Sequence, residues 1–445
     1  MKRYAIASAV TLGALAAVEP AFAQEAAKVS ADTITGVPKE TAFVFNTLLF
    51  LIMGFLVMWM AAGFAMLEAG LVRSKNVSMQ CLKNIALYSI AGIAFWLVGY
   101  NLMYGIEKGG FIGTFAPFVH AAGDSGLDTG YAGDSDWFFQ MVFCATTASI
   151  VSGTLAERIK LWPFLLFIVV LTGILYPITG SWKWGKGWLE VRGFLDFAGS
   201  TLVHSVGGWA ALTGAIILGG RKGKYGASGA VTPMPGSSIP LATLGTFILW
   251  LGWFGFNGGS QLAIGGLSDA NAVAKIFTNT NVAAAAGVLV AMGLTQIIYK
   301  KVDVTMALNG ALAGLVAITA EPLTPSFLMA IIIGGIGGAI VVFAVPALDK
   351  LKIDDVVGAI PVHLLAGIWG TLAVPLTNGD AKFGEQIIGI VSIGAFTVVT
   401  SGILWLVLKY TIGIRVSEEE EALGLDKTEV GVEAYPEFGQ GSQRV

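Results

Sequence analysis

Apolar runs long enough to cross a lipid bilayer recur along almost the whole chain of 445 residues. An α-helix needs about 20 mostly apolar residues to span the hydrocarbon core, and the runs are close to that length or longer. They cover residues 43–71, 81–104, 137–156, 161–180, 199–219, 239–259, 277–299, 304–320, 326–346, 358–376 and 386–412. The sequence therefore predicts an all-α polytopic membrane protein with eleven transmembrane helices.

The composition also favours contact with membrane lipid and excludes several other classes. Charged residues make up 12% of the chain, whereas soluble domains carry about 25%. The formal net charge of −3 is too small to indicate a nucleic-acid partner. The 59 glycines suit close contacts between membrane helices. The two cysteines, Cys81 and Cys144, support no disulfide framework.

The N-terminus has the pattern of a secretory signal peptide over residues 1–23. Lys2 and Arg3 precede a short apolar run, and an A-x-A cleavage site follows just before Gln24. The alternative is an uncleaved first helix, but the apolar run is too short to span a membrane comfortably. We expect cleavage, which leaves residues 24–40 as a periplasmic N-terminal segment.

Loop charges give an independent test of this topology. With the N-terminus outside, the loops on the inner side should collect Lys and Arg. They do so at Arg73, Lys75, Lys83, Arg158, Lys160, Arg221, Lys222, Lys224, Lys300, Lys301, Lys350 and Lys352. One outer loop departs from the rule and carries Lys183, Lys186 and Arg192. The pattern predicts a protein of the bacterial inner (plasma) membrane with a periplasmic N-terminus and a cytoplasmic C-terminus.

The chain divides into a pore domain and a tail. Residues 41–415 contain the eleven spans, and residues 416–445 form a polar segment that opens with four glutamates, Glu418 to Glu421. An acidic end of this kind is typically solvated and partly disordered. The alternative is a cytoplasmic regulatory tail, which we keep as the more specific hypothesis.

A weak internal repeat relates the two halves of the chain. Asp196 precedes His204 by eight residues at the head of the fifth span, and Asp355 precedes His363 by eight residues at the head of the tenth. The ends of the first and sixth spans echo each other in residues 63–70 and 252–259. An offset of five spans inverts the second half, so we expect two inverted five-helix repeats plus a final helix, with the substrate path at their interface.

Two of the three histidines, His204 and His363, lie inside predicted spans. Ionisable groups are costly in hydrocarbon and usually mark an ion or proton path. A single such histidine can equally make a structural hydrogen bond, but two at matched positions of an inverted repeat favour function. Neutral imidazole both donates and accepts, so two stacked rings can line a narrow path and share one proton. Asp196 and Asp355 are expected to brace the helix starts.

Aromatic side chains gather near the ends of several spans. They include Phe139 with Phe143, Trp253 with Phe256, and Trp184 in the outer loop that departs from the charge rule. Such residues usually serve core or interface packing. They can also attract a cation, by roughly 0.5 to 2 kcal/mol, where a hydroxyl such as that of Ser260 lies nearby. Sequence spacing alone does not bring Phe143, Trp184 and Ser260 together.

Motifs for other chemistry are missing from the sequence. It contains no P-loop, no H-E-x-x-H motif, no cysteine cluster and no nucleophile elbow. We therefore expect neither an enzyme nor a bound metal or cofactor.

Several segments together resemble the Amt/Mep/Rh family of ammonium transporters, in its bacterial Amt form. The resemblance covers nearly the whole mature chain and is most specific in the fifth span. Its segments are residues 71–76 (LVRSKN), 139–143 (FQMVF), 153–158 (GTLAER), 196–204 (DFAGSTLVH), 219–221 (GGR), 252–260 (GWFGFNGGS), and the tail from 413 to 435.

The resemblance implies a role for each candidate residue. Phe143, Trp184 and Ser260 would recruit ammonium at the outer mouth, and Phe143 would stack on Phe256 as a gate beneath it. His204 and His363 would be the twin histidines that line the pore, and Phe139 and Trp253 would flank the path. Asp196 would support the recruiting site, and the internal repeat places Asp355 at the matching position of the second half. The resemblance also implies a homotrimer with one pore per subunit and a PII signal protein as a cytoplasmic partner.

The sequence departs from the family pattern just before the second histidine. Gly358 stands five residues before His363, where the common pattern has an acidic residue, and Leu364 follows where the pattern has glycine. The departure leaves the histidine in place. It changes the electrostatics expected at the cytoplasmic vestibule and the fit expected for a PII loop.

These observations predict an ammonium transporter that serves nitrogen uptake. Taking bare NH4+ out of water carries an idealised cost on the order of 20 kcal/mol, reduced to several after relaxation. We therefore expect recruitment of NH4+, deprotonation below the mouth, and passage of NH3, with or without the proton, along the histidines. The alternatives are a channel for neutral gases, a sensor that acts through its tail, and a haem protein with His204 and His363 as axial ligands.

Overall fold

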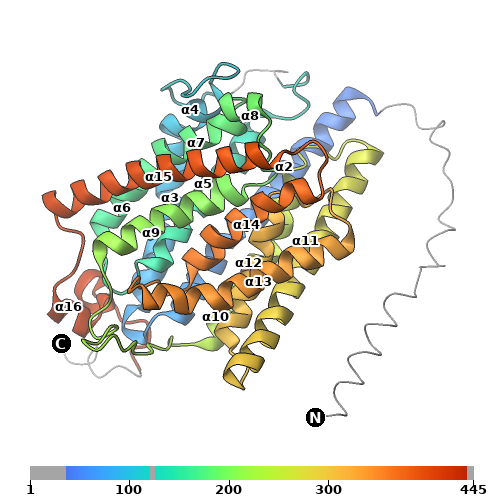
Figure 1. The fold of residues 1–445 in the computed structure, drawn as a ribbon. Coiled ribbons are helices and arrows are strands. Elements are labelled where there is room, and N and C mark those ends of the chain that lie inside the picture. The colour runs from blue at the N-terminus through green and yellow to red at the C-terminus, as the bar shows by residue number, and fades with distance from the viewer. Residues whose placement is uncertain (1–36, 121–125, 438–445) are drawn as a thin grey trace, which may run out of the picture. The chain divides into compact units, whose positions relative to one another are not determined.

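The computed structural model describes residues 37–120 and 126–437. The predicted signal peptide, residues 1–23, lies outside this part of the chain, as does most of the predicted periplasmic segment. The described residues form a bundle of membrane-length helical segments joined by loops (Figure 1).

The first half of the bundle contains five helical segments. They are α2 (Lys39–Leu71); α3 (Val77–Ala94), preceded by η2 (Ser74–Asn76) and continued by η3 (Phe95–Gly99) and α4 (Tyr100–Tyr104); α5 (Gly133–Thr154); α6 (Leu161–Val170) with η4 (Leu171–Leu175), α7 (Tyr176–Lys183) and the short α8 (Trp188–Arg192); and η5 (Ser200–Ser205) with α9 (Val206–Leu218).

The second half repeats this order and adds a final helix. Its segments are α10 (Ile239–Gly259), α11 (Leu267–Tyr299), α12 (Val304–Thr319), α13 (Phe327–Lys350), and η6 (Ile360–Leu365) with α14 (Ala366–Ala373) and η7 (Val374–Leu376), followed by α15 (Phe383–Thr411). Two short helices, α16 (Glu418–Leu423) and η8 (Asp426–Val430), belong to the tail. All eleven predicted spans are therefore found as helical segments within the described residues.

The largest difference from the predicted bounds is at the seventh span. We expected it to begin at residue 277, but α11 begins at Leu267. The added residues include Ser268, Asp269, Asn271 and Lys275, so hydropathy excluded them although they are helical. Hydropathy detects only the part of a helix that is apolar, so it misses helical turns that extend beyond the apolar stretch.

The two halves use the same pattern of helix neighbours. In the first half α2 packs on α3 and α5, and in the second half α10 packs on α11 and α12. Likewise α5 contacts α9, as α12 contacts α14. The two leading helices, α2 and α10, also pack closely on each other. A Cβ atom added at Gly245 would lie 2.3 Å from the backbone nitrogen of Leu67, so glycine permits this approach.

The outer surface of the bundle is apolar along most helices. Large exposed side chains include Phe55 and Trp59 on α2, Phe247 on α10, Phe343 on α13 and Val399 on α15. Within the described residues, eight helices have the length and hydropathy of membrane spans, and α12 and the segment from η6 to η7 are shorter apolar helices. The fold is that of an integral membrane protein, because such a surface is stable against lipid rather than water.

In the loop that departs from the loop-charge rule, two of the three positive side chains pair with neighbouring carboxylates. Lys183 forms an ion pair with Glu190, and Arg192 pairs with Glu385 at 2.9 Å. Sequence position alone does not reveal these local ion pairs.

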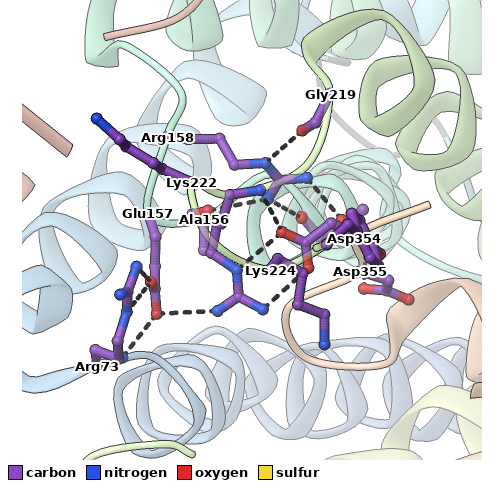
Figure 2. A network of polar contacts seen from close by, with 12 residues as sticks. Arg73, Ala156, Glu157, Arg158, Gly219, Lys222, Lys224, Asp354 and Asp355 are labelled. Carbon is purple, nitrogen blue, oxygen red and sulfur yellow. Dashed lines mark hydrogen bonds and ion pairs between the residues drawn. The ribbon is translucent and has the colours of Figure 1, made fainter. Parts of the chain in front are cut away.

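The end of the bundle that carries the tail, here called the tail end, holds a buried network of charges (Figure 2). Arg221 forms two hydrogen bonds with the carboxylate of Asp354, both 2.9 Å long. Glu157 pairs with Arg73 at 2.5 Å and with Arg221 at 3.3 Å. Arg158 donates to the backbone oxygen of Gly219 at 2.9 Å. The network thus joins four loops.

Two members of this network have shifted pKa values. Burial alone would raise the pKa of Asp354, but hydrogen bonds from Arg221 and the charges of Arg158 and Arg221 lower it to about 2. Burial lowers the pKa of the Arg158 guanidinium to about 10, partly offset by the charge of Asp354. Both groups therefore stay charged at neutral pH, and the loops remain tied together.

The tail folds back on the bundle rather than extending into solvent. Arg415 pairs with Glu421 at 2.7 Å, and Glu421 also accepts from the backbone N–H of Lys222 at 2.7 Å. Asp426 accepts from the backbone N–H groups of Val77 at 3.1 Å and Met79 at 2.9 Å, and so caps the start of α3. Its described residues, up to 437, contact several loops of the tail end.

Candidate functional site

Three cavities lie along one path through the bundle. The first, called the mouth, has a volume of about 550 Å³ and lies at the end opposite the tail. The second is a small cavity beside His363, and the third is a tail-end cavity of about 350 Å³. Helix α5 runs along this path, because it contributes Asp136 to the mouth and Gly153 to the small cavity.

The mouth contains all three residues of the expected recruiting site. Phe143 on α5, Trp184 after α7 and Ser260 after α10 line this one cavity. The Phe143 and Trp184 rings meet edge to face, with centroids 6.1 Å apart. Trp184 is held by a hydrogen bond of 3.0 Å from Nε1 to the backbone oxygen of Asp196. Two aromatic rings and a hydroxyl are the groups that attract a small cation.

A stacked pair of phenyl rings closes the floor of the mouth. The centroids of Phe143 and Phe256 are 4.0 Å apart and their planes differ by 28°. Both side chains are buried. Phe139 also lines the mouth and packs on Phe143 at 4.8 Å. A molecule that passes from the mouth toward the histidines must displace at least one of the stacked rings.

His204 and His363 are in contact beneath this stack. Their Nδ1 atoms are 3.1 Å apart, and the two side chains are 0% and 3% exposed. Trp253 stacks on His204 with centroids 4.9 Å apart, and its Nε1 is held by Thr319 at 2.8 Å. Nε2 of His204 has no hydrogen-bond partner among the described residues. A small molecule able to hydrogen-bond would satisfy this buried nitrogen.

The two aspartates fix the helices that carry the histidines. Asp196 accepts four hydrogen bonds of 2.8 to 3.1 Å from the backbone N–H groups of residues 199–202. Asp355 accepts from the N–H groups of Gly358 at 3.2 Å and Ile360 at 2.7 Å, and from the hydroxyl of Thr154 at 3.0 Å. Each aspartate therefore supplies the missing acceptors at a helix start.

The local geometry at the two helix starts is also matched. Gly199 and Gly358 stand three residues after their aspartates, with φ angles of +105° and +80°. Each is followed by a π-helical turn, η5 or η6, that contains the histidine. A left-handed backbone suits glycine, which has no Cβ atom. The glycine at 358 thus repeats the backbone of the first half.

Burial affects the charge of both aspartates. It raises the pKa of Asp196 to about 6, although the four backbone donors favour the charged form. It also raises the pKa of Asp355, against the hydrogen bonds from Ile360 and Thr154. Asp196 lines none of the three cavities and Asp355 lines only the tail-end cavity, and both carboxylates accept mainly from backbone N–H groups, which agrees with a supporting role.

Sequence reasoning missed two acidic groups along the path. Asp136 lines the mouth, where it accepts from the hydroxyl of Tyr100 at 2.5 Å and from Gln140 at 3.0 Å. Glu68, at the end of α2, lines the small cavity with His363. The loop charges considered in the sequence analysis do not include Asp136, and Glu68 appears there only within the echoed segment 63–70. A carboxylate within an apolar span was the available signal for Glu68.

Metal binding finds no support in this geometry. Among residues 37–120 and 126–437, no group of three or more His, Cys, Asp or Glu side chains is placed to hold a metal ion. The path offers aromatic faces, hydroxyl groups such as that of Ser260, the carboxylates of Asp136 and Glu68, and two imidazoles, which suit a small nitrogenous cation and its neutral base.

Comparison with known sequences finds ammonium transporters by a family model and by individual relatives. The model of the Ammonium Transporter Family matches residues 48–435. Amt2 of Archaeoglobus fulgidus is 44% identical over 418 residues, which cover 87% of this chain and 87% of that protein. A putative ammonium transporter of Synechocystis is 42% identical over 416 residues, which cover 91% of this chain and 93% of that protein.

Comparison with solved structures extends the similarity to the fold. A sensor Amt protein superposes with a TM-score of 0.83 at 35% identity, over 88% of this chain and all of the other. Mep2 of Candida albicans superposes with a TM-score of 0.79 at 28% identity, over 91% of this chain and 94% of the other.

Proposed function

The chain belongs to the ammonium transporter family, and from this premise we propose how its residues move the substrate. It is an integral membrane transporter of ammonium and not an enzyme. The proposal assigns recruitment to the mouth, gating to the phenyl stack and conduction to the histidine pair. The observation that carries it is the buried contact between His204 and His363 directly beneath the stacked rings of Phe143 and Phe256.

Recruitment takes place where water still reaches the substrate. In the mouth the ring faces of Phe143 and Trp184 and the hydroxyl of Ser260 replace part of the hydration shell of NH4+. The oxygen of Ser260 already donates its proton to the backbone oxygen of Phe256 at 2.8 Å, so its lone pairs remain free for the cation.

Deprotonation of NH4+ follows from the hydration energy that the cation would lose on passing the phenyl stack. Directly below the phenyl stack, at the histidine pair, the surroundings are aromatic rings and neutral imidazoles, which cannot replace the hydration of a full charge. Neutral NH3 loses much less on entering and can donate to or accept from the imidazole nitrogens. The cation therefore gives up its proton to water in the mouth, above the stack, and NH3 passes along His204 and His363 toward the tail end.

Topology completes the proposal. The mouth faces the periplasm and the tail faces the cytoplasm, as the loop charges predict. Residues 1–23 are a signal peptide, residues 24–40 a periplasmic segment, residues 41–415 the pore domain and residues 416–445 a cytoplasmic regulatory tail. The chain forms a homotrimer with one pore per subunit in a bacterial inner membrane, and PII signal proteins bind the tail end. Family resemblance supports these last assignments.

Reconstituted protein provides the test. Ammonium transport into proteoliposomes is measured against concentration for the wild type, Trp184→Ala and Trp162→Ala. Loss of one cation–π contact of roughly 0.5 to 2 kcal/mol should raise the half-saturating concentration about 2- to 30-fold in Trp184→Ala. Trp162, which is exposed at the start of α6, serves as the control and should leave this concentration unchanged. Identical curves for all three proteins would refute the recruiting site.

A further inference from the structure

Glu68 is a buried carboxylate that the proposed function does not use. It lies in the last turn of α2 and is 1% exposed. Its Oε2 atom accepts hydrogen bonds from Gln80 at 2.6 Å, Asn84 at 3.1 Å and Ser152 at 2.8 Å. Its other oxygen, Oε1, is buried and has no partner in the part of the chain that the structure describes. An unpartnered buried carboxylate oxygen is costly and calls for a ligand.

The carboxylate lines the small cavity immediately beyond the histidine pair. His363, Phe64 and Ser149 line the same cavity. Its volume of about 10 Å³ for the centres of water-sized molecules corresponds to roughly one such molecule. Ammonia and ammonium are of this size. A molecule that leaves His363 toward the tail end therefore reaches a single-occupant space with Glu68 on its wall.

This cavity leads onward to the tail-end cavity. Asn309 and Val357 line both, and the Asn309 amide donates to the backbone oxygen of Val357 at 3.0 Å. The small cavity thus lies between the histidines and the larger opening. Glu68 occupies the last enclosed position on the path before polar surroundings begin.

The inverted repeat shows that the structural role of this position does not require a charge. In the echoed segments 63–70 and 252–259, Glu68 corresponds to Asn257. Asn257 donates to Thr280 on α11 at 2.9 Å and accepts from Thr319 on α12 at 3.2 Å, so both of its polar atoms are satisfied.

Glu68 connects the equivalent helices of the first half, α3 through Gln80 and Asn84 and α5 through Ser152. A neutral amide therefore suffices to hold the leading helix against its two neighbours. The acid at 68, which lines the small cavity, adds a titratable oxygen, and this oxygen has no partner among the described residues.

We propose that Glu68 is the inner proton donor of the transport cycle. This inference rests on the proposed function, because it requires NH3 to arrive from His363. In the small cavity one O–H bond of the carboxylic acid breaks and one N–H bond forms, which gives NH4+ beside a carboxylate whose oxygen keeps the electron pair. The cation leaves through the tail-end cavity, and a hydronium ion of the cytoplasmic water protonates Glu68 again.

Lys83 is positioned to assist the release of the cation. Its Nζ donates to the backbone oxygen of Ser152 at 2.8 Å, and the Ser152 hydroxyl donates to Glu68. The Lys83 ammonium group also lies 4.6 Å from the centroid of Phe164, and its side chain is buried. Its positive charge stabilises the carboxylate and repels the newly formed NH4+, so the cation does not remain trapped.

Glu68→Gln provides the test, with Glu321→Gln as its matched control. Glutamine keeps the shape and the hydrogen bonds at position 68 but cannot give up a proton. The maximal rate of ammonium transport in proteoliposomes should fall on the order of 100-fold, with little change in the half-saturating concentration set at the mouth. Glu321 is also a buried carboxylate, bonded to the N–H groups of Leu323 and Thr324 and outside all three cavities, so Glu321→Gln should transport normally.

The outcomes separate this inference from the proposed function. A wild type that does not transport ammonium would refute the proposed function. A wild type that transports ammonium, with a folded Glu68→Gln that transports equally well, would refute only the role of Glu68. A purely structural role predicts this second result, because the amide of Asn257 fills the matching position in the other half.

A second measurement keeps the inference testable if Glu68→Gln does not fold. Infrared difference spectra, recorded on adding ammonium to the wild type and to Glu68→Asp, report carboxylic acids that change protonation. The inference predicts a carboxylic-acid band in the wild type that shifts in Glu68→Asp. The absence of such a band, or a band that is identical in both proteins, would contradict it.

Discussion

The Nδ1 atoms of His204 and His363 are separated by 3.1 Å, so the two imidazoles share one hydrogen bond. Only one of two facing nitrogens can carry the hydrogen, which means that the neutral rings adopt complementary tautomers. Nε2 of His204 has no hydrogen-bond partner within residues 37–120 and 126–437. The rings of Trp253 and Phe256 pack against this imidazole. The pair thus offers NH3 a donor or an acceptor without requiring a charge in the bilayer.

The backbone at Gly358 yields a stability prediction. Its φ of +80° disfavours residues with a Cβ atom by roughly 1 to 2 kcal/mol, and a Cβ atom there would lie 2.6 Å from Nδ2 of Asn309. Gly358→Ala should therefore lower the melting temperature of the detergent-solubilised protein. Gly402→Ala, in α15 with nothing within 4 Å of the added atom, is the control and should melt no lower than the wild type, because alanine favours a helix interior over glycine. Equal melting temperatures for the two variants would argue against this backbone conformation.

The carboxylate of Asp354 predicts a loss of stability in acid. Its pKa is about 2 in the folded protein and 3.8 unperturbed, so unfolding takes up a proton between these values. The contribution, on the order of 2 kcal/mol, is complete above about pH 4 and disappears as the pH falls toward 2. Asp354→Asn should weaken this decline in melting temperature, whereas the exposed Asp134→Asn should preserve it. A wild type that is equally stable at both ends of this range would contradict the ion pair with Arg221.

Docking of the tail can be tested at Asp426. This carboxylate caps α3 through the N–H groups of Val77 and Met79, and loss of a helix cap costs about 1 kcal/mol. Asp426→Ala should expose the tail and speed its cleavage by a protease about fivefold. Glu419→Ala, at an exposed position of α16, should not change the rate. Equal cleavage of both variants would indicate that the cap does not hold the tail.

Hydropathy and the internal repeat predicted most of the architecture. The eleven spans follow from apolar length, and the equivalence of His204 and His363 follows from their shared spacing to an aspartate. The bounds of α11 were wrong because helical residues outside the apolar stretch carry no hydropathy signal. The contacts of the tail with the bundle could not be predicted, because they involve residues hundreds of positions away, such as Asp426 with Val77.

The candidate site was less accessible to sequence reasoning. Phe143, Trp184 and Ser260 lie on three separate segments, and only the packing of α5, α7 and α10 brings them into one cavity. Glu68 was overlooked because the sequence analysis treated it only as one position of the echoed segments 63–70 and 252–259. Its significance depends on one unpartnered oxygen and one small cavity, which exist only once α2, α3 and α5 are packed together.

The most direct test of the account is the maximal rate of ammonium transport by purified His204→Ala in proteoliposomes. Removal of this ring deletes the hydrogen bond with His363 and the buried Nε2 atom. If these two groups together stabilise the passing NH3 by about 1.4 kcal/mol, their loss slows transport roughly tenfold. The account predicts such a fall in a folded, correctly inserted protein, with little change in the half-saturating concentration. A His204→Ala protein that transports ammonium as fast as the wild type would contradict conduction along the histidine pair.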